Sequence, residues 1–470
     1  MGNWATSGSG KKRMARRIWL FVLAVALGGA NLTCERSITV GVIGDQFGAE
    51  NADSAYAVLE KAVARVNGFQ PDIVLHVGDL LESVRQVRSF DDYKFRFSQA
   101  VKNMNGLTAP WLMAVGDHDV VPPVFRPMSA DRSREMWFIE QSNAHHLLNA
   151  NRFYYSYDVN DYHFVVLYSL ENLHTDPRWG SIFLNKISDE QFAWLKSDLQ
   201  NAAHAKGIFV LVHHPHWYVW QNWARVHELL RQYPVAIVLA GHFHYDQDEG
   251  ELDGIRYIVI GATGGAVKMI DPDSGGGHQY AVLKIRGRKL KQIILRDVFS
   301  NAEIELTPRP TMDRIQALTC MLDNLWQDEK LIARRDAIYT QDNCGKFTPV
   351  KTVGLESLSN PIDLPIQIAI EYNDVLTNPR WSSGEVAGDS TLILPAGARV
   401  GWANYATVGQ WSPLPPLWLA DLKSPSRALQ EGIELRIKIT FNDGRRREMV
   451  KVQKYMVEKK IRSSYGDQIF

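Results

Sequence analysis

The sequence predicts an α/β domain of layered sheets and helices, followed by a smaller all-β domain. Between about Ile38 and Arg296, short apolar runs alternate with amphipathic helical patterns, which is typical of an α/β domain. From about Thr307 the pattern changes to one helical stretch and then to β-like segments punctuated by Pro and Gly. The 470 residues allow two or three domains at roughly 150 residues each.

The predicted strands of the first domain are short apolar runs. The run at 164–168 is apolar throughout, as expected for a strand that is buried on both faces. We expect strands at 38–43, 72–77, 111–115, 164–168, 208–212, 236–240 and 257–260.

Two helices of this domain carry start signals. Asp53 is a candidate N-cap for a helix with an apolar face formed by Tyr56, Leu59, Val63 and Val66. Ser188 and Gln191 form a capping-box pattern before Phe192, Leu195 and Leu199, which follow at helical spacing.

The second half of the chain divides into a connector and a β domain. Residues 312–338 are predicted to be helical, and the segments 365–372, 390–397 and 433–441 are predicted strands. The last of these alternates apolar and polar residues, as a half-exposed antiparallel strand does. The predicted domains are therefore 36–305, a helical connector at 306–349, and a β-sandwich-like domain at 350–470.

The N-terminus has the layout of an export signal. Five basic residues between 11 and 17 precede an apolar run at 18–27 and small residues through Ala30, which is the order found in secretory signal peptides. Cleavage is expected near Asn31. The run is short for a spanning helix, which needs ~20 residues, but an uncleaved anchor stays open. Residues 1–30 thus predict a periplasmic, extracellular or membrane-anchored protein that contacts a membrane only through this segment.

Charge and cysteine content narrow the functional classes. Lys+Arg and Asp+Glu number 52 each, so no net charge attracts the chain to nucleic acid or anionic lipid. Without a basic stripe that interleaves with aromatic residues, a nuclease is not favoured. Cys320 and Cys344 could pair in an oxidising compartment or be two unrelated buried thiols. Neither lies in a CxxC motif, so no thiolate metal site is expected.

Acidic or imidazole side chains follow five of the predicted strands. In open α/β sheets, ligands bind beyond the carboxyl ends of the strands, so these residues can converge although they span two hundred positions. We expect the preceding glycines to let the backbone turn sharply. Mixed carboxylates and imidazoles suit Mn, Fe or Zn, and two such ions roughly 3.5–4 Å apart can activate water for phosphoryl transfer. The motifs are Gly44-Asp45, Gly78-Asp79, Gly116-Asp117-His118-Asp119, His213-His214-Pro215 and Gly241-His242-Phe243-His244.

In order and spacing, these motifs resemble the signature GDxH, GDxxD, GNH(D/E), H, GHxH of the calcineurin-like metallophosphoesterase superfamily. The resemblance covers residues 38–296. It implies a layered β-sandwich flanked by helices, with a dinuclear centre of two divalent or trivalent metal ions. It also implies the following roles: Asp79 bridges both ions, Asp45 and His244 bind one ion, Asp117, His213 and His242 bind the other, and His118 assists the leaving group.

Two positions depart from that signature. Phe47 stands where the family has a histidine ligand, which weakens the first metal site. Purple acid phosphatases also lack that histidine and use a tyrosine three residues after the bridging aspartate, where this chain has Glu82. Glu82 could bind the first ion, or orient His118 as the second acid of GDxxD. Asp117 replaces an asparagine, and its added charge favours metal retention but opposes an anionic substrate.

Other histidines and aromatic residues near the motifs have less certain roles than the motif residues. His76 lies within a predicted strand and is expected to be structural. His214 and His216 flank the ligand motif and could touch a substrate phosphate. The Trp-rich stretch at 216–223 could line a substrate groove or only cap the edge of the sheet.

These observations give two functional hypotheses. The first is hydrolysis of phosphomonoesters or phosphodiesters by a metal-bridged hydroxide, with His118 as general acid. The alternative is a catalytically degenerate member that acts as an extracytoplasmic binding or scaffold module. Phe47 supports the alternative, whereas the retained His118 and the two histidines of Gly241–His244 support the enzyme.

Overall fold

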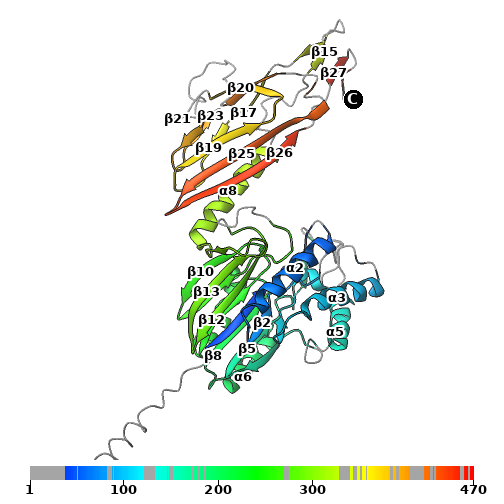
Figure 1. Cartoon of the computed structure of the whole chain (residues 1–470), viewed down its shortest axis with the longest axis vertical. Helices are drawn as coiled ribbons and strands as arrows, with labels where there is room; N and C mark the ends of the chain where they lie inside the picture. Colours follow the sequence, from blue (N-terminus) through cyan, green and yellow to red (C-terminus); the bar gives the residue numbers. More distant parts are fainter. Residues whose placement is uncertain are drawn as a thin grey trace, which may run out of the picture.

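The computed structural model describes the greater part of both domains (Figure 1). Its described residues are 37–49, 51–81, 87, 89–120, 133–145, 147, 152–171, 173–176, 180–183, 187–267, 275–327, 339–341, 347–349, 352–355, 357–381, 385–387, 391–401, 418–423, 427, 430–455, 460–463 and 466–469. The predicted signal peptide or anchor at 1–30 and the candidate residue Glu82 lie outside these ranges. Within them, no helix is long and apolar enough to cross a membrane.

Two six-stranded sheets form the first domain. The first has the order β14-β13-β12-β1-β2-β3, and the second β10-β11-β9-β8-β5-β4. Strands β1 to β3 are parallel to one another, as are β5, β8, β9 and β11. The bounds are β1 Ile38–Ile43, β2 Ile73–His76, β3 Trp111–Met113, β4 Tyr155–Val159, β5 Tyr162–Leu167, β8 Gly207–Val212, β9 Val235–Ala240, β10 Gln247–Leu252, β11 Ile255–Val259, β12 Gln279–Arg286, β13 Lys289–Asp297 and β14 Glu303–Ile304, with a separate pair β6 Leu173–Asp176 and β7 Gly180–Phe183.

Helices pack on the outer faces of both sheets and make four layers, and Figure 1 shows α2, α3 and α5 beside the first sheet. One hydrophobic core lies between the sheets and includes Val42, Leu75 and Phe209. A second joins α2, α3 and α5 to the first sheet, and a third joins α6 and α7 to the second. This layered sandwich confirms the predicted fold class. The bounds are α2 Ala52–Asn67, α3 Phe90–Met104, α4 Asp117–Val120, α5 Ser133–Ala144, α6 Asp189–Asn201, the 3-10 helix η2 His216–Val219 and α7 Trp220–Leu230.

The predicted strands of this domain each match an observed strand to within two residues at both ends. The prediction missed the hairpin β12–β13, which completes the first sheet beyond β1. Strand β13 has only two buried residues, Ile294 and Leu295, among partly and fully exposed ones. Its apolar pattern is therefore too weak to indicate a strand.

The helix caps agree with the sequence only in part. Asn51, and not Asp53, caps α2, because the Asn51 side chain accepts a hydrogen bond of 2.9 Å from Ser54 N. Ser188 caps α6 as predicted, accepting from Gln191 N at 3.0 Å. The Gln191 side chain does not complete the capping box, since its amide binds both the N–H and the C=O of Tyr168.

An all-β domain follows helix α8 (Arg309–Gln327), as predicted (Figure 1). Its main sheet has the order β21-β22-β19-β25-β26, and a second has the order β17-β24-β20. Of the predicted helix 312–338, residues 328–338 lie outside the described part. The bounds are β15 Tyr339–Gln341, β16 Phe347–Pro349, β17 Thr352–Leu355, β18 Ser357–Ser359, β19 Ile366–Tyr372, β20 Leu376–Trp381, β21 Glu385–Ala387, β22 Thr391–Leu394, β23 Arg399–Gly401, β24 Trp418–Leu422, β25 Ile433–Asn442, β26 Arg446–Tyr455, β27 Lys460–Ser463 and β28 Gly466–Ile469.

Cys320 lies on α8 as an exposed free thiol. It is therefore neither disulfide-bonded nor buried, and both sequence interpretations of this residue were wrong. Cys344 lies outside the described residues.

An ion-pair triad ties the edge of the second sheet to α6. His163 on β5 bonds Asp158 through Nδ1 at 2.6 Å and Asp198 through Nε2 at 2.8 Å. Burial lowers the pKa of His163, but the two hydrogen bonds and charges outweigh it and raise the pKa above the ordinary value of 6.5. The charged form of His163 is thus favoured in the folded state.

This triad predicts a pH-dependent contribution to stability. Because the folded-state pKa of His163 is raised, its contribution is fully present below about pH 6.5 and is lost as pH rises through the folded-state pKa. His163→Gln should lower the free energy of unfolding by about 1–2 kcal/mol at acidic pH, and by less at alkaline pH. Urea unfolding across pH measures the difference, with the exposed His204→Gln as control. A difference that stays constant with pH would contradict this account.

Candidate metal centre

The ends of β1, β2 and β9 meet at one edge of the sandwich. Asp45 N donates to Gly78 O at 2.9 Å, and Gln46 N donates to Asp79 O at 2.9 Å. Both carboxylate oxygens of Asp45 accept from His242 N at 3.1 Å, which links the two sheets. Residues from these three strand ends are therefore brought together, as the sequence predicted from their positions.

Four of the motif residues themselves adopt left-handed backbone conformations. The φ angles are 57° at Asp45, 53° at Asp79, 73° at His242 and 60° at His244. Such angles are uncommon for residues other than glycine and persist where the surrounding structure enforces them.

The glycines of these motifs serve mainly to make space, which corrects the sequence interpretation. Of Gly44, Gly78, Gly116 and Gly241, only Gly78 has a positive φ. A Cβ atom at Gly116 would collide with the Asp79 carboxylate, and one at Gly241 with the Asp45 carboxylate. The side chains of the centre thus occupy the space that these glycines leave open.

A buried hydrogen-bond chain holds the Asp45 loop from behind. His76 Nδ1 accepts from Gly78 N at 3.2 Å, so Nε2 carries the proton and donates to Gln46 Oε1 at 2.7 Å. Gln46 Nε2 in turn donates to Thr263 O at 2.8 Å. Burial, aided by the nearby His213, lowers the pKa of His76 to about 3. The ring is neutral and structural, as predicted.

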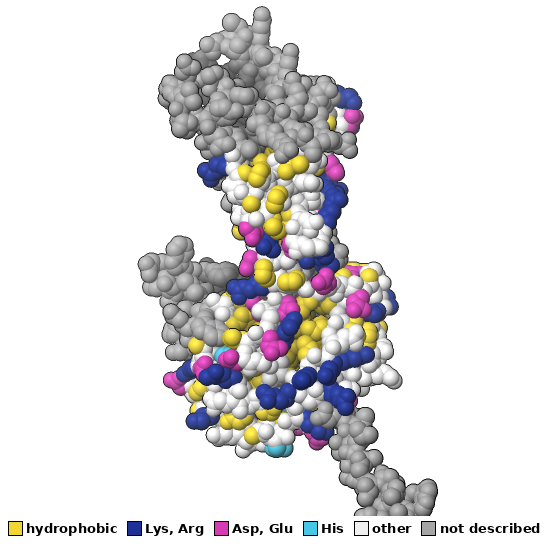
Figure 2. Space-filling view, turned by 90° about the vertical axis from the view of Figure 1, so that its left-hand side faces the viewer, with side chains coloured by type: hydrophobic (Ala, Val, Ile, Leu, Met, Phe, Trp, Pro, Cys, Tyr) yellow, Lys and Arg dark blue, Asp and Glu magenta, His cyan; other side chains and the backbone are white. Residues whose placement is uncertain are grey.

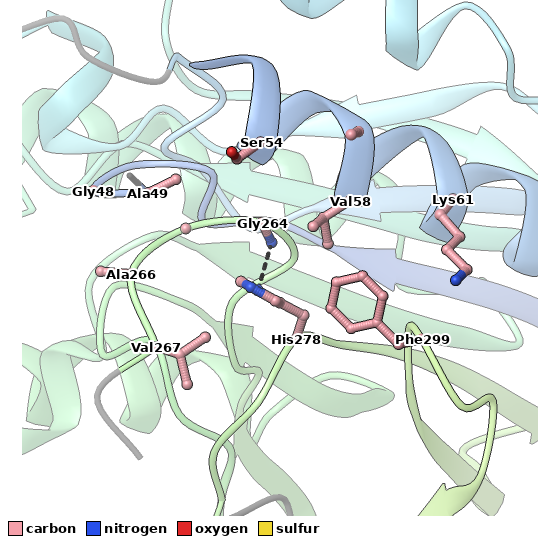
Figure 3. A pocket seen from close by; sticks show the side chains of 12 residues that line it. Gly48, Ala49, Ser54, Val58, Lys61, Gly264, Ala266, Val267, His278 and Phe299 are labelled. Atoms are coloured by element: carbon pink, nitrogen blue, oxygen red, sulfur yellow. Dashed lines mark hydrogen bonds between the residues drawn. The ribbon is translucent and has the colours of Figure 1, made fainter. Parts of the chain in front are cut away.

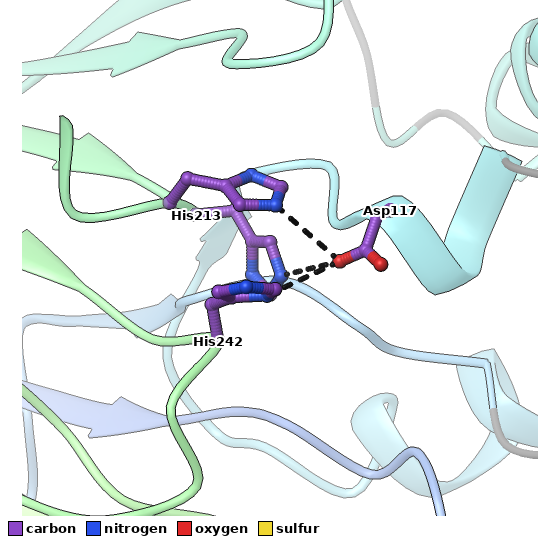
Figure 4. Close-up of side chains that lie close together, drawn as sticks. Asp117, His213 and His242 are labelled. Atoms are coloured by element: carbon purple, nitrogen blue, oxygen red, sulfur yellow. Dashed lines mark hydrogen bonds and ion pairs between the residues drawn. The ribbon is translucent and has the colours of Figure 1, made fainter. Parts of the chain in front are cut away.

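Asp117 is surrounded by imidazole rings (Figure 4). Its Oδ1 lies 3.3 Å from His213 Nε2, 3.3 Å from His242 Nδ1 and 3.5 Å from His214 Nε2. His213 Nδ1 donates to Val77 O at 2.8 Å, so Nε2 faces the carboxylate. Such backbone anchoring of one ring nitrogen is typical of metal-binding histidines.

Asp79 joins this group to Asp45. Its Oδ1 accepts from His118 N at 2.9 Å, and His213 Nε2 lies 3.5 Å from its Oδ2. Among the described residues, Asp79 Oδ2 is fully buried and has no hydrogen-bond donor. A buried carboxylate oxygen in this state fits a metal ligand.

We refer to these residues together as the Asp/His cluster. They form three groups in which the candidate ligand atoms lie within 4.8 Å of one another. These groups are Asp117, His213, His214 and His242; Asp45, Asp79 and His213; and Asp79, Asp117 and His118.

His244 is the one predicted metal ligand that lies in none of these groups. Its Nδ1 donates to Ala266 O at 2.7 Å, which leaves Nε2 as its candidate ligand atom. The ring is buried beside the Asp45–Phe47 loop, because a Cβ at Gly265 would contact both Asp45 O and the His244 ring.

Phe47 stacks face to face on His118. The ring centroids are 3.2 Å apart and the planes differ by 8°. His118 Nε2 also lies 3.4 Å from Asp117 Oδ2. The residue that replaces the family's histidine therefore packs on the predicted general acid.

Sequence reasoning gave no firm role to His214 and overlooked Asp119. His214 Nδ1 bonds Ser169 Oγ at 2.7 Å, and its ring is tilted against His242 at 4.1 Å between centroids. Asp119 accepts from Leu81 N at 3.0 Å and from Gly116 N at 2.9 Å, so it ties the β2 and β3 loops together. The only signals were their positions beside His213 and His118 in the motifs.

His216 lies next to the cluster, since its N–H donates to His214 O at 2.8 Å, whereas the described tryptophans of this stretch lie in the core. Trp217 and Trp223, the latter on α7, are buried in the core between this helix and the second sheet, and His216 is stacked parallel to Trp223. The interpretation that these residues cap the sheet is the one that the packing favours.

The electrostatics of the cluster favour a cation. Burial, aided by Asp79, raises the pKa of Asp45 to about 8 although His213 opposes it. Burial lowers the pKa of His213, but the Asp79, Asp117 and Asp45 carboxylates together raise it well above its ordinary value. Burial and the neighbouring His242 hold the pKa of His214 well below its ordinary value. Protons at Asp45 and His213 thus compensate charge that a metal ion would otherwise balance.

A pocket of about 730 Å³ lies between helix α2 and the segment Gly264 to Val267 (Figure 3). Residues of α2, including Val58 and Lys61, form one side, and Gly264 to Val267 with Phe299 form the other. Gly265 N donates to Asp45 O and Ala266 N to Phe47 O, both at 2.9 Å. These backbone pairs join one wall of the pocket to the loop that carries Asp45 and Phe47.

Comparison with known proteins agrees with this geometry. Residues 38–246 match the family model described as calcineurin-like phosphoesterase. The chain is 29% identical over 240 residues to purple acid phosphatase 23 of Arabidopsis thaliana, an alignment that covers 43% of this chain and 48% of that relative. The chain thus spans about half the length of that protein.

Two solved structures are also similar to part of this chain. A dimetal phosphatase from Danio rerio shares 16% identity, with a TM-score of 0.39, over 55% of this chain and 98% of that one. The purple acid phosphatase PPD1 from yellow lupin, Lupinus luteus, shares 16% identity, with a TM-score of 0.40, over 59% of this chain and 55% of that one.

Removing the carboxylate of Asp79 should abolish metal binding. Asp79→Asn replaces the buried anion that lies in two of the three ligand groups, so metal content measured by mass spectrometry should fall to background. Asp198→Asn, which changes a carboxylate remote from the cluster, should retain metal. If Asp79→Asn held as much metal as the wild type, Asp79 would not be a ligand.

Proposed function

We propose that this chain is an exported, metal-dependent phosphohydrolase that cleaves phosphomonoesters or phosphodiesters. The observation that carries the proposal is the buried Asp/His cluster at the carboxyl ends of five strands, in a domain that matches the family model of calcineurin-like phosphoesterases. Export is supported by the basic region and apolar run within residues 1–30. N-terminal sequencing of the native protein would test export, because a chain that is full-length and free of membranes would contradict it.

The donor set fits two metal ions of the Mn, Fe or Zn type. A bound pair supplies Lewis acidity, which neutralises charge on phosphate oxygens and lowers the pKa of water. Asp79 is the candidate shared ligand because its Oδ2 is buried without a hydrogen-bond donor. The remaining candidate ligands are Asp45 and His244 for one ion, and Asp117, His213 and His242 for the other, with His214 close to the second set.

His118 is the proposed proton donor to the leaving oxygen. Its backbone is fixed by the hydrogen bond to Asp79, and its side chain is 14% exposed, so an approaching ester could reach the ring. The Asp117 carboxylate 3.4 Å from Nε2 favours the protonated ring. A histidine held in this way can donate a proton as the ester bond breaks.

Phe47 is the observation that favours the alternative function. It cannot ligate a metal, and its ring covers one face of His118. If the first site were empty for this reason, the domain could act as a binding or scaffold module. The same contact also supports the enzyme, because a stacked ring restricts His118 to one orientation.

A substrate screen on metal-reconstituted protein separates the two functions. Phosphomonoesters and phosphodiesters would be offered with excess Mn, Fe or Zn, and bound metal would be counted in parallel. We expect hydrolysis of at least one ester class by the metal-loaded chain only. Protein that retains no metal and cleaves no ester would leave the scaffold function in place.

The general-acid role predicts a leaving-group dependence. His118→Asn should retain metal but lower kcat about 10²–10⁴-fold for alkyl esters, whose leaving oxygen needs a proton. Activated aryl esters, whose leaving group departs without a proton, should be slowed much less. His204→Asn, at an exposed histidine, serves as the control. An equal loss of rate for both ester types would argue against proton donation by His118.

The effect of Phe47 on metal binding and on His118 can be tested by two substitutions of different chemistry. Phe47→His restores a ligand and should raise metal content toward two ions per chain. Phe47→Leu supplies no ligand and removes the ring from His118, so it should lower kcat without a gain in metal. Metal counting and steady-state kinetics measure both effects. Unchanged metal content in Phe47→His would show that this position does not face a metal site.

A further inference from the structure

The loop that carries His242 and His244 contacts two different parts of the molecule. His242 Nδ1 lies 3.3 Å from Asp117, and His244 Nδ1 binds Ala266 O, so both histidines turn toward the metal loops. Phe243 and Tyr245 alternate with them and pack instead into the hydrophobic core formed by α8 and the C-terminal sheet. Tyr245 is 7% exposed. The loop is therefore shared between the metal centre and the second domain.

Several contacts fix the aromatic side of this loop. The rings of Phe243 and Tyr245 stack at 5.2 Å between centroids, and Tyr218 meets Phe243 edge-on at 5.0 Å. Gln316 on α8 donates a hydrogen bond to the Tyr245 hydroxyl. Arg309, also on α8, lies over the Tyr218 ring at 4.8 Å. The helix thus contacts the loop both by packing and by hydrogen bonding.

The chain that enters α8 is anchored beside the same loop. Asp246 Oδ1 accepts from Thr307 N at 2.7 Å, and Asp248 N donates to Thr307 O at 2.8 Å. Arg309 also pairs with Glu249 at 3.0 Å, and the Glu249 side chain is only 6% exposed. Residues 246–249, which directly follow the loop, therefore set the position at which α8 begins.

The far side of α8 is bound to the C-terminal domain. Arg314 makes two hydrogen bonds to Asp363, at 2.7 and 2.9 Å, and Thr311 bonds Asp443 in the β25–β26 turn. Arg445 in that turn pairs with Glu305 at 2.8 Å. Figure 2 shows basic and acidic side chains side by side at the narrow junction of the two domains. Helix α8 thus connects the metal loop to the C-terminal sheet.

The backbone of the loop needs such support. His242 and His244 both have positive φ angles, 73° and 60°, and non-glycine residues persist in this strained region only where the surrounding structure enforces it. The contacts of Phe243 and Tyr245 with α8 supply that enforcement from the side opposite the metal centre.

We propose that α8 and the C-terminal domain form a clamp that positions the metal-binding histidines, with Phe243 and Tyr245 as the positioning residues. The inference rests on the proposed metal-dependent function, since it assigns His242 and His244 to the two ions. The clamp also gives the second domain a role in shaping the metal centre, because contacts with that domain set the geometry of the loop that carries His242 and His244.

The test uses the full-length protein and substitutions on the aromatic side of the loop. Tyr245→Leu removes both the ring stack and the hydroxyl, and Tyr245→Phe removes only the hydrogen bond from Gln316. The control is Leu392→Ala, which creates a cavity in the same core cluster from strand β22. Metal affinity is measured by competition with a chelator, and hydrogen exchange is followed at residues 242–246 under conditions where all variants are folded.

We expect Tyr245→Leu to weaken metal binding about 10–100-fold, the range for residues that orient metal ligands, and Tyr245→Phe to weaken it less. Exchange at 242–246 should quicken in Tyr245→Leu but not in Leu392→Ala. Excess metal should restore the hydrolysis rate of Tyr245→Leu. Wild-type affinity and unchanged exchange in Tyr245→Leu would overturn the clamp.

The two readouts separate this inference from the proposed function. Exchange at 242–246 needs no metal, so it reports on the clamp even if the wild type binds none. A wild type that binds metal but cleaves no phosphate ester would refute the enzyme, while the shift in metal affinity would still support the clamp.

Discussion

Burial of three carboxylates at one sheet edge is the constraint on which the rest of the structure depends. Asp45 and Asp79 are fully buried and Asp117 is 7% exposed. Like charges in such a site cannot all remain ionised without compensation. Without metal, protons bound to Asp45 and His213, whose pKa values are both raised, balance part of this negative charge. Bound metal ions would balance the charge in place of these protons, since metal binding displaces protons from its ligands.

The surrounding structure fixes the loops of the Asp/His cluster from two sides. Behind the cluster, the neutral His76 and Gln46 fix the loop that carries Asp45. On the opposite side, Phe243 and Tyr245 pack into the core that α8 shares with the C-terminal sheet. Glycines leave space for the carboxylates, and four of the six candidate ligand residues take left-handed conformations. The geometry of the centre is therefore set by groups that do not themselves bind metal.

The sequence predicts the layers and the convergence of the motifs, because buried parallel strands are apolar throughout and their carboxyl ends share one edge. It does not predict the β12–β13 hairpin, since β13 has only two buried residues. It also could not show that Phe47 stacks on His118, or that Tyr245 packs on a helix seventy residues later. Such contacts depend on tertiary packing, which local patterns do not encode.

The most direct measurement is a metal titration of stripped wild-type protein that follows bound metal, released protons and phosphate-ester hydrolysis together. The buried cluster predicts that metal uptake releases protons from its Asp and His side chains and that hydrolysis rises in proportion to bound metal. Hydrolysis that does not depend on metal, or metal uptake without proton release or hydrolysis, would contradict the account.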